Sequence, residues 1–435
     1  MRDPEGDLSM SPDWVYRRRK SAFDDGHFLR GAVAEEWVRN GRLVAYGFED
    51  ANVVKSPRVP FVSHPSEWCD QQLFDAAALT LDLAEALLKE QRELKDASAW
   101  NVIFDGCVPI FCDLFSAQDL KSKKWRAFGQ FARHFLLPLT LSKHRGFSGY
   151  QSFRLWRDGL TPEMAANLLG WRRLFPRNAL LLSQSTNAEQ GVAEHEGEPN
   201  AQFSARLYSG LRWVLEGVAP RAVRSQWGEY EDQRTHYDGS SLESKRTIVR
   251  DWMHQSAPER VIDLGCNAGE FSRIALEAGA MAVCLDGDHE AIQTLYRSSQ
   301  GERRLFPVLA NLDDLSGGRG WEANEHPALL VRMQSWNADL VLVLALIHHL
   351  LTASIPAARV ASFVASITRR FAIVEFIDET DAQLALLCRQ RGRAPSEFSI
   401  RVQREAFESA GFAVVDLIEI PGIPRQLALL ERKTP

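Results

Sequence analysis

The sequence lacks the features that mark membrane-spanning, zinc-binding and broadly nucleic-acid-binding proteins. Its longest apolar stretch, 339–347, spans nine residues including Asp339 at its start, whereas a transmembrane helix needs about 20. The six cysteines are scattered and no two form a Cys-x-x-Cys pair, so we predict no metal site. With 51 basic against 57 acidic residues, the net charge of −6 lacks the basic excess of a nucleic-acid surface.

The start of the chain, its length and one polar segment indicate where the protein resides and how its domains are arranged. Residues 1–7 contain no apolar signal core, so we expect a cytoplasmic protein without a membrane anchor. A chain of 435 residues exceeds one typical core. Residues 184–204 are polar, acidic and without periodicity, which predicts a linker. The expected domains are therefore an N-terminal accessory or substrate-recognition domain at 1–183, a linker and bridging helix at 184–225, and a C-terminal domain at 226–435.

The most informative segment is 261–269, Val-Ile-Asp-Leu-Gly-Cys-Asn-Ala-Gly. An apolar run ends at Asp263, a loop contains Gly265 and Gly269, and apolar residues then recur at helical spacing. Because glycine has no Cβ, a strand, a glycine loop and a helix can bring the backbone close to a nucleotide-like ligand. Seventeen residues after Gly269, a second apolar run ends at Asp286, whose carboxylate can accept both hydroxyls of a ribose.

This loop differs from the dinucleotide-binding pattern. Cys266 and Asn267 stand where G-x-G-x-x-G would place its second glycine, and no Lys-Ser/Thr pair follows to hold a phosphate. A ligand with adenosine but no pyrophosphate therefore fits better. The pattern D-x-G-x-x-x-G resembles motif I of class I S-adenosylmethionine-dependent methyltransferases. The resemblance implies S-adenosylmethionine as the cofactor and Asp286 as the acid that binds its ribose.

The second half of the chain alternates predicted strands and helices, which indicates a doubly wound parallel sheet. Two final strands joined by a short turn must be antiparallel. We therefore predict an α/β, Rossmann-like seven-stranded methyltransferase sheet with a C-terminal antiparallel hairpin, preceded by an N-terminal α+β domain. The expected strands are 260–264, 281–286, 305–310, 339–346, 371–376, 411–420 and 426–430, with helices at 241–255 and 355–369.

Ligands of open α/β sheets bind at the carboxyl ends of the strands. That rule gathers the ends of the predicted strands on one edge and defines the expected cofactor site. Asp288 and Asp313 lie nearby and are alternative ligands for the cofactor, although we expect each of them to cap a helix instead. The candidate cofactor-binding residues are Asp263, Gly265, Cys266, Asn267, Gly269, Asp286, Gly287, Asn311 and Leu312.

Candidate catalytic residues follow the fourth and fifth strands. His348 closes the run 339–347 and is the first candidate base, because the histidine pKa lies near neutral pH. Glu375, at the end of the next strand, is the reserve candidate. His349 points elsewhere and is assigned to the acceptor. The alternative is that both histidines only form local hydrogen bonds.

A narrower resemblance concerns segments around this core. Trp227-Gly228-Glu229-Tyr230, Tyr237, Lys245, Gly320-Trp321 and 345–350 resemble the NoeA-like nodulation proteins, a group of bacterial methyltransferases. The resemblance covers most of the chain and implies a transferase without fixing its substrate. Trp227, Tyr230 and Tyr237 are candidates to line the acceptor pocket; packing of the preceding helix on the sheet is the alternative.

In the N-terminal half, Asp96, Asn101, a hairpin and then Asp113 resemble the catalytic segment of protein and aminoglycoside kinases. Two departures argue against phosphotransfer. Leu94 stands where that family has a histidine, and no glycine-rich nucleotide loop precedes the segment. We expect a degenerate kinase-like domain used for substrate recognition or packing. An unrelated helical domain is equally open.

These observations favour an S-adenosylmethionine-dependent methyltransferase that acts on oxygen or nitrogen of a small-molecule, glycan or natural-product acceptor. Nucleic acid and membranes are not expected partners. Three alternatives stay open: an RNA methyltransferase, a non-catalytic protein that binds the cofactor or serves as a scaffold, and a bifunctional kinase–methyltransferase.

Overall fold

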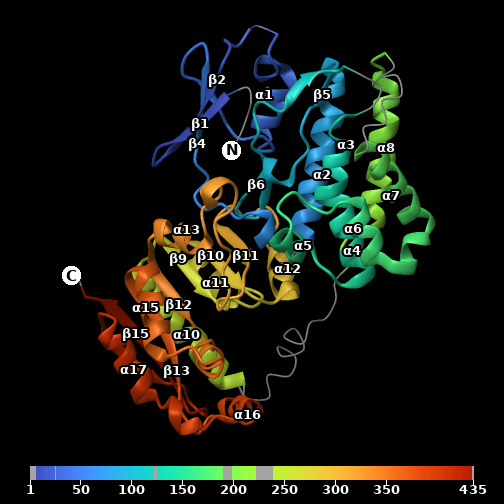
Figure 1. The fold of residues 1–435 in the computed structure, drawn as a ribbon. Coiled ribbons are helices and arrows are strands. Elements are labelled where there is room, and N and C mark those ends of the chain that lie inside the picture. Colours follow the sequence, from blue (N-terminus) through green and yellow to red (C-terminus); the bar gives the residue numbers. More distant parts are fainter. Residues whose placement is uncertain (1–5, 25, 122–124, 190–197, 222–238, 434–435) are drawn as a thin grey trace. The chain divides into compact units, whose positions relative to one another are not determined.

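The computed structural model describes residues 6–24, 26–121, 125–189, 198–221 and 239–433 (Figure 1). Contacts within the chain divide it into two compact units, 1–221 and 222–435. In the ranges just given, no helix combines the length and the apolar character that crossing a membrane requires.

Unit 1 contains short antiparallel sheets, as expected for an α+β domain. A four-stranded sheet has the order β1-β2-β4-β3. Further along the chain, β5 pairs with β8 and β6 pairs with β7. The strands are β1 (Gly6–Met10), β2 (Trp14–Arg19), β3 (Gly47–Phe48), β4 (Val53–Pro57), β5 (Arg92–Leu94), β6 (Val102–Asp105), β7 (Val108–Phe111) and β8 (Ala117–Asp119).

Helices form the rest of unit 1. The longest of its early helices, α2, buries the apolar stripe that its Leu and Ala spacing provides, and α2 packs on α8 and β7. The helices are α1 (Ala32–Arg39), α2 (Asp70–Leu87), α3 (Phe128–Phe131), α4 (Leu137–Arg145), α5 (Gly149–Leu155), α6 (Pro162–Leu169), α7 (Pro176–Glu189) and α8 (Ala201–Gly217).

Unit 2 is built on one seven-stranded sheet with the order β11-β10-β9-β12-β13-β15-β14 (Figure 1). The first five of these strands are parallel, whereas β15 runs antiparallel to both β13 and β14. The predicted sheet with a C-terminal antiparallel hairpin is therefore confirmed. The strands are β9 (Arg260–Leu264), β10 (Met281–Asp286), β11 (Leu305–Leu309), β12 (Ala338–Val343), β13 (Thr368–Ile377), β14 (Phe412–Glu419) and β15 (Arg425–Arg432).

Two groups of helices cover this sheet. The connection from β9 to β10 runs toward one edge of the sheet, and the connection from β12 to β13 runs toward the other edge. Because both crossovers are right-handed, their helices α11 and α15 lie on opposite faces of the sheet. α10 packs on α11, while α15 packs on α13 and α17. The helices are α10 (Gly239–Ser256), α11 (Glu270–Glu277), α12 (His289–Ser298), α13 (Leu329–Trp336), α14 (Ile347–Thr352), α15 (Ala357–Ile367), α16 (Ala382–Arg391) and α17 (Ile400–Ser409).

The fourth predicted strand of the sheet ends earlier than expected. β12 stops at Val343, and Ala345 has a positive φ of 50°. The backbone amide of Ala345 donates to the buried carboxylate of Glu375 at 2.9 Å, which turns the chain away from the sheet. The apolar run continues past this turn because Ile347 is buried on α14. Length of the run was therefore a poor guide to the length of the strand.

The expected linker also differs from the structure. α7 extends to Glu189 and α8 begins at Ala201, so parts of 184–204 are helical. The bridging helix expected within 184–225 corresponds to α8, which ends at Gly217. Its polar and basic residues belong to the exposed side of a helix that packs within unit 1.

Candidate functional site

The direction in which successive strands are added to the sheet reverses at β9, which lies between β10 and β12. The chain leaves these neighbours toward opposite faces, and such a switch point leaves a crevice at the carboxyl ends of the strands. Three loops meet at this edge: 265–269 after β9, 287–288 after β10 and 344–346 after β12. A Cβ built at Gly265 would lie 3.2 Å from Cδ1 of Leu346, so the first and third loops are in contact.

Backbone hydrogen bonds hold the glycine loop against β10. The amides of Gly265 and Cys266 both donate to the carbonyl of Leu285, at 2.8 and 3.0 Å. Positive φ angles of 72°, 49° and 82° at Gly265, Asn267 and Gly269 produce the tight path. Glycine is needed at Gly269 for a second reason, because an added Cβ would lie 2.3 Å from a methyl carbon of Leu295.

Asp286 ends β10 beside this loop. Its Oδ2 accepts from the Asn267 amide and its Oδ1 accepts from the Asp288 amide, both at 2.8 Å. Burial raises the pKa of Asp286. Asp288 caps α12 by accepting from the amides of Glu290 and Ala291, as expected.

Asp263 occupies a different setting from Asp286. Its side chain is only 2% exposed, and its Oδ2 accepts from the Ser272 hydroxyl at 2.6 Å. Burial raises the pKa of Asp263 to about 6. Asp263 therefore fastens the first turn of α11 to β9 rather than presenting a carboxylate at the surface.

Gly287 and Asn311 come together at the ends of β10 and β11. A Cβ on Gly287 would lie 2.4 Å from Oδ1 of Asn311. Both residues are exposed, and the following Leu312 is half-buried. The edge predicted for the cofactor thus combines the glycine loop, Asp286, Gly287 and Asn311.

Glu375 lies inside β13, not at its end, and is completely buried. Its carboxylate contacts Nζ of Lys245, accepts from Nη1 of Arg425 at 3.0 Å and accepts from the Ala345 amide. Nε of Arg425 also donates to Asp381 at 2.8 Å. Burial lowers the pKa of Lys245. Two cations and an amide therefore contact the Glu375 carboxylate, and its role as a base stays a prediction.

Lys245, Arg425 and Asp381 are members of this network that reasoning on the sequence did not assign to the site. Lys245 also lies over the ring of Phe271, 4.9 Å from its centroid, at the start of α11. Their signal was weak, because a lysine in an amphipathic helix and an arginine beside a turn are usually exposed.

The two histidines lie on α14, not at the end of a strand. His348 is 2% exposed, and burial, followed by the nearby His349 and Arg425, lowers its pKa well below the usual range. In the described part of the chain its Nδ1 is buried without a hydrogen-bond partner. His349 is half-buried, its ring centroid lies 4.1 Å from that of His348, and burial lowers its pKa to about 4.

The aromatic candidates for the acceptor pocket, Trp227, Tyr230 and Tyr237, lie outside the described residues. Their assignment stays a prediction.

In unit 1 the kinase-like segment forms the expected hairpin. β6 and β7 pair antiparallel, Asn101 directly precedes them and Asp113 follows them. Burial raises the pKa of Asp96, and its carboxylate accepts from the Ser98 amide at 3.1 Å. Arg17 of β2 donates to the carbonyl of Cys112 at 2.9 Å. Leu94 stays where the kinase pattern needs a histidine, so the departures noted in the sequence persist.

Comparison with known proteins gives one relative along nearly the whole chain. No family model matches. The chain is 28% identical to the nodulation protein NoeA of Rhizobium meliloti (strain 1021), over 99% of this chain and 95% of NoeA. The predicted resemblance to NoeA-like proteins is thereby confirmed.

Solved structures similar to the chain cover about half of it. Magnesium protoporphyrin IX methyltransferase from Synechocystis PCC 6803, with bound S-adenosylmethionine, is 17% identical with a TM-score of 0.36, over 48% of this chain and 93% of that one. The N-methyltransferase NodS from Bradyrhizobium japonicum WM9 is 12% identical with a TM-score of 0.34, over 45% and 99%. The chain is thus similar to NoeA across both units, and its C-terminal unit has the seven-stranded sheet of the class I methyltransferase fold.

Proposed function

We propose that the chain is an S-adenosylmethionine-dependent methyltransferase that acts on oxygen or nitrogen of a small-molecule or glycan acceptor. The observation that carries the proposal is the glycine loop fastened beside Asp286 at the switch point of the sheet. The whole-length similarity to NoeA agrees with a function that uses both units.

The residues at this edge fit an adenosine-containing cofactor. A carboxylate offers about four lone pairs. The amides of Asn267 and Asp288 donate to one oxygen each of Asp286, and the Gly287 amide also interacts with the carboxylate. The remaining acceptor capacity suits a ribose hydroxyl. Gly287 and Asn311 lie beside Asp286 and would flank the adenine, while the loop from Gly265 to Gly269 would border the rest of the cofactor. Bound S-adenosylmethionine supplies an activated methyl group, so the protein mainly has to align the acceptor.

For a hydroxyl acceptor, we assign proton removal to His348. Its buried Nδ1 without a partner in the described part of the chain is the observation behind this choice, because buried nitrogens are normally hydrogen-bonded. His348 lies two residues after Leu346, whose side chain packs on the glycine loop. Since burial lowers the pKa of His348, its imidazole is neutral throughout the neutral range and has an unprotonated nitrogen, but it is a weaker base than a free imidazole.

The cofactor assignment is tested by calorimetric titration of the full chain with S-adenosylhomocysteine. Asp286→Ala removes a hydrogen bond to a charged acceptor, which should weaken binding by about 1.5–3 kcal/mol. Asp251→Ala, which removes an exposed carboxylate on α10, is the matched control and should bind like wild type. Equal affinity of wild type and Asp286→Ala would refute the site.

Catalysis is tested separately from binding. Incubation with labelled S-adenosylmethionine and candidate acceptors, followed by mass spectrometry, distinguishes an enzyme from a protein that only binds the cofactor. His348→Ala should lower turnover by roughly 10²-fold while cofactor affinity stays within about threefold. The wild-type rate should show no inflection near pH 6.5 from this group, because its pKa lies well below that value. An unchanged rate in His348→Ala would show that alignment alone suffices.

A further inference from the structure

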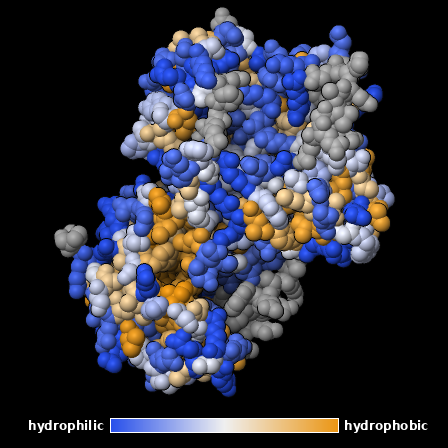
Figure 2. All heavy atoms as spheres, in the orientation of Figure 1, coloured by the Kyte–Doolittle hydropathy of each residue, from blue (hydrophilic) through white to orange (hydrophobic). Residues whose placement is uncertain are grey.

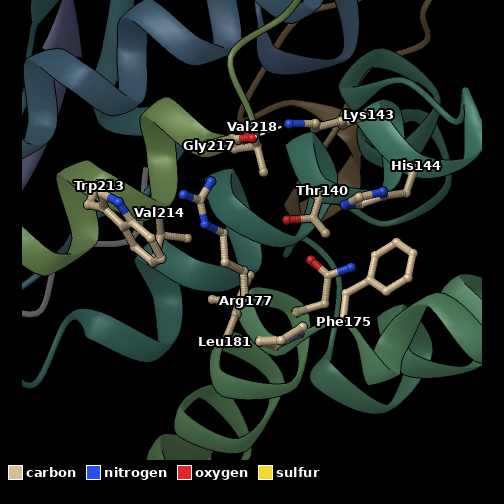
Figure 3. A pocket seen from close by; sticks show the side chains of 12 residues that line it. Thr140, Lys143, His144, Phe175, Arg177, Leu181, Trp213, Val214, Gly217 and Val218 are labelled. Carbon is tan, nitrogen blue, oxygen red and sulfur yellow. Dashed lines mark hydrogen bonds between the residues drawn. The ribbon is translucent and has the colours of Figure 1, made fainter.

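Unit 1 contains a cavity that the proposed methyl transfer does not use. It lies among α4, α7 and α8 and has a volume of about 400 Å³ (Figure 3). Cavities that bind small molecules have volumes of roughly 300–1,000 Å³. All of its lining residues belong to unit 1, so the cavity does not depend on the placement of unit 2.

The lining combines basic and apolar side chains. Lys143, His144 and Arg177 supply the basic groups, and none of the described residues that line the cavity is acidic. Phe175 and Trp213 are 39% and 49% exposed, so their rings remain accessible. Figure 2 shows further apolar side chains gathered on this part of the surface, around α6 and α7. The chemistry matches a ligand with an anionic group and an apolar body.

The two permanent cations are not neutralised within the part of the chain that the structure describes. Neither Lys143 nor Arg177 forms a salt bridge there; Lys143 donates to the carbonyl of Gly217. Burial, together with the positive charges of Arg221 and Arg177, lowers the pKa of Lys143. Burial and Lys143 lower the pKa of His144. Burial makes the larger contribution to both pKa shifts, and repulsion among the basic groups adds to it; a bound anion would relieve that repulsion.

Arg177 is held in position by its neighbours on α8. Its guanidinium carbon lies 3.8 Å from the centroid of Trp213, a cation–π contact. Its Nη1 also lies against Gly217, where an added Cβ would come within 2.5 Å. Figure 3 shows Arg177 extending toward Gly217 from one side, with Lys143 and His144 approaching from the other. The guanidinium is therefore oriented before any ligand arrives.

An arginine on α8, Arg212, shows the contrast. Arg212 lines a second, more open hollow of about 610 Å³. Its Nη2 is 2.6 Å from Asp82 and 3.0 Å from Glu85, so its charge is balanced within the protein. The two arginines thus differ: the charge of Arg212 has acidic partners, whereas that of Arg177 has none in the part of the chain that the structure describes.

We propose that this cavity binds a soluble organic phosphate, with Arg177 and Lys143 on the phosphate oxygens and the apolar body against Phe175 and Trp213. Phosphate is preferred over carboxylate because two cations converge, and a guanidinium fork together with an ammonium can serve three oxygens at once. His144, a neutral imidazole at neutral pH, can donate a further hydrogen bond.

The test uses the full chain and three probes: phenyl phosphate, inorganic phosphate and benzyl alcohol. Calorimetry should show phenyl phosphate binding more tightly than inorganic phosphate, benzyl alcohol not binding, and affinity falling with added salt. Arg177→Gln and Lys143→Gln should each weaken phenyl phosphate binding by about 10- to 100-fold, the equivalent of one charge-assisted hydrogen bond. Both side chains are exposed, so the variants should fold.

Arg206→Gln is the matched control, because Arg206 is an exposed arginine on α8 that does not line the cavity. It should bind phenyl phosphate like wild type. Asp286→Ala should also leave this binding unchanged, which separates the result from the cofactor test. Absence of binding by wild type up to about 10 mM, or equal losses in Arg177→Gln and Arg206→Gln, would overturn the proposal.

Discussion

Replacing Glu375 by glutamine should destabilise the C-terminal unit strongly. The substitution keeps the size of the side chain but removes the negative charge that faces Lys245 and Arg425. The side chains of Glu375, Lys245 and Arg425 are 0%, 3% and 3% exposed, so water cannot compensate. With Asp381, the wild-type cluster has two positive and two negative charges; the variant has one unbalanced positive charge.

Removing one partner of a buried ion pair costs about 3–5 kcal/mol, and this is the loss expected for Glu375→Gln. Urea unfolding, combined with hydrogen exchange of peptides from β13 and β15, assigns the change to this unit. Asp313→Asn, an exposed carboxylate changed in the same way, should alter stability by less than about 0.5 kcal/mol. The double variant Lys245→Met, Glu375→Gln should recover part of the loss, because it also removes a buried cation.

The loss should depend on pH. Burial lowers the pKa of Lys245 in the folded chain, and in Glu375→Gln its main counter-charge is gone. Between that lowered pKa and the unfolded value of about 10.4, the unfolded chain binds more protons, so stability rises with pH. The deficit of Glu375→Gln should therefore shrink when pH is raised from neutral toward about 9. A variant that is as stable as wild type but inactive would refute the structural role and support Glu375 as a base.

Three further outcomes are expected. Gly269→Ala should lower the free energy of unfolding by about 2–4 kcal/mol, because the left-handed backbone is strained and the added methyl group overpacks against Leu295. Gly279 has a φ of 90° but open space around it, so Gly279→Ala should show only the backbone strain. Urea unfolding of both variants measures the difference. Burial lowers the pKa of His134 to about 3. Between about pH 6.5 and pH 3 the unfolded chain therefore binds more protons than the folded chain, and stability falls as pH falls. His134→Gln should flatten this slope in acid-unfolding curves, and an unchanged slope would contradict the role of His134 in the pH dependence. Unit 1 should not turn over ATP, because the nucleotide loop and the histidine of kinases are missing; magnesium-dependent hydrolysis that disappears in Asp113→Ala would show otherwise.

The strands and the glycine loop were predictable because their signals are local. The apolar runs before Asp263 and Asp286, and the glycines at 265 and 269, occupy short stretches of sequence that specify their own geometry. The position of His348 on a helix was not predictable from the sequence. It depends on the turn at Ala345, whose amide donates to an acceptor in another strand. The partners of Glu375 were not predictable for the same reason, because they lie on other elements.

The buried ion network shows most clearly what cannot be predicted from the sequence alone. Lys245 and Glu375 are 130 residues apart, and Glu375 and Arg425 are 50 apart. Each residue alone has the pattern of a surface or strand-end charge. Lys245 lies on α10, whereas Glu375 and Arg425 lie on β13 and β15. Only the tertiary fold brings the three residues together, and no short-range pattern in the sequence specifies it.

The order of the sheet has a consequence for how the polypeptide acquires its shape during synthesis. β15 lies between β13 and β14, although it follows both along the chain. Until residues 425–432 leave the ribosome, β13 keeps an open edge of unpaired backbone groups, which is a template for aggregation. Arg425 arrives with the same strand and completes the partners of Glu375. The nascent unit therefore cannot close its sheet or balance its buried charges in stages, and a translational stall before this point should leave a species that depends on chaperones.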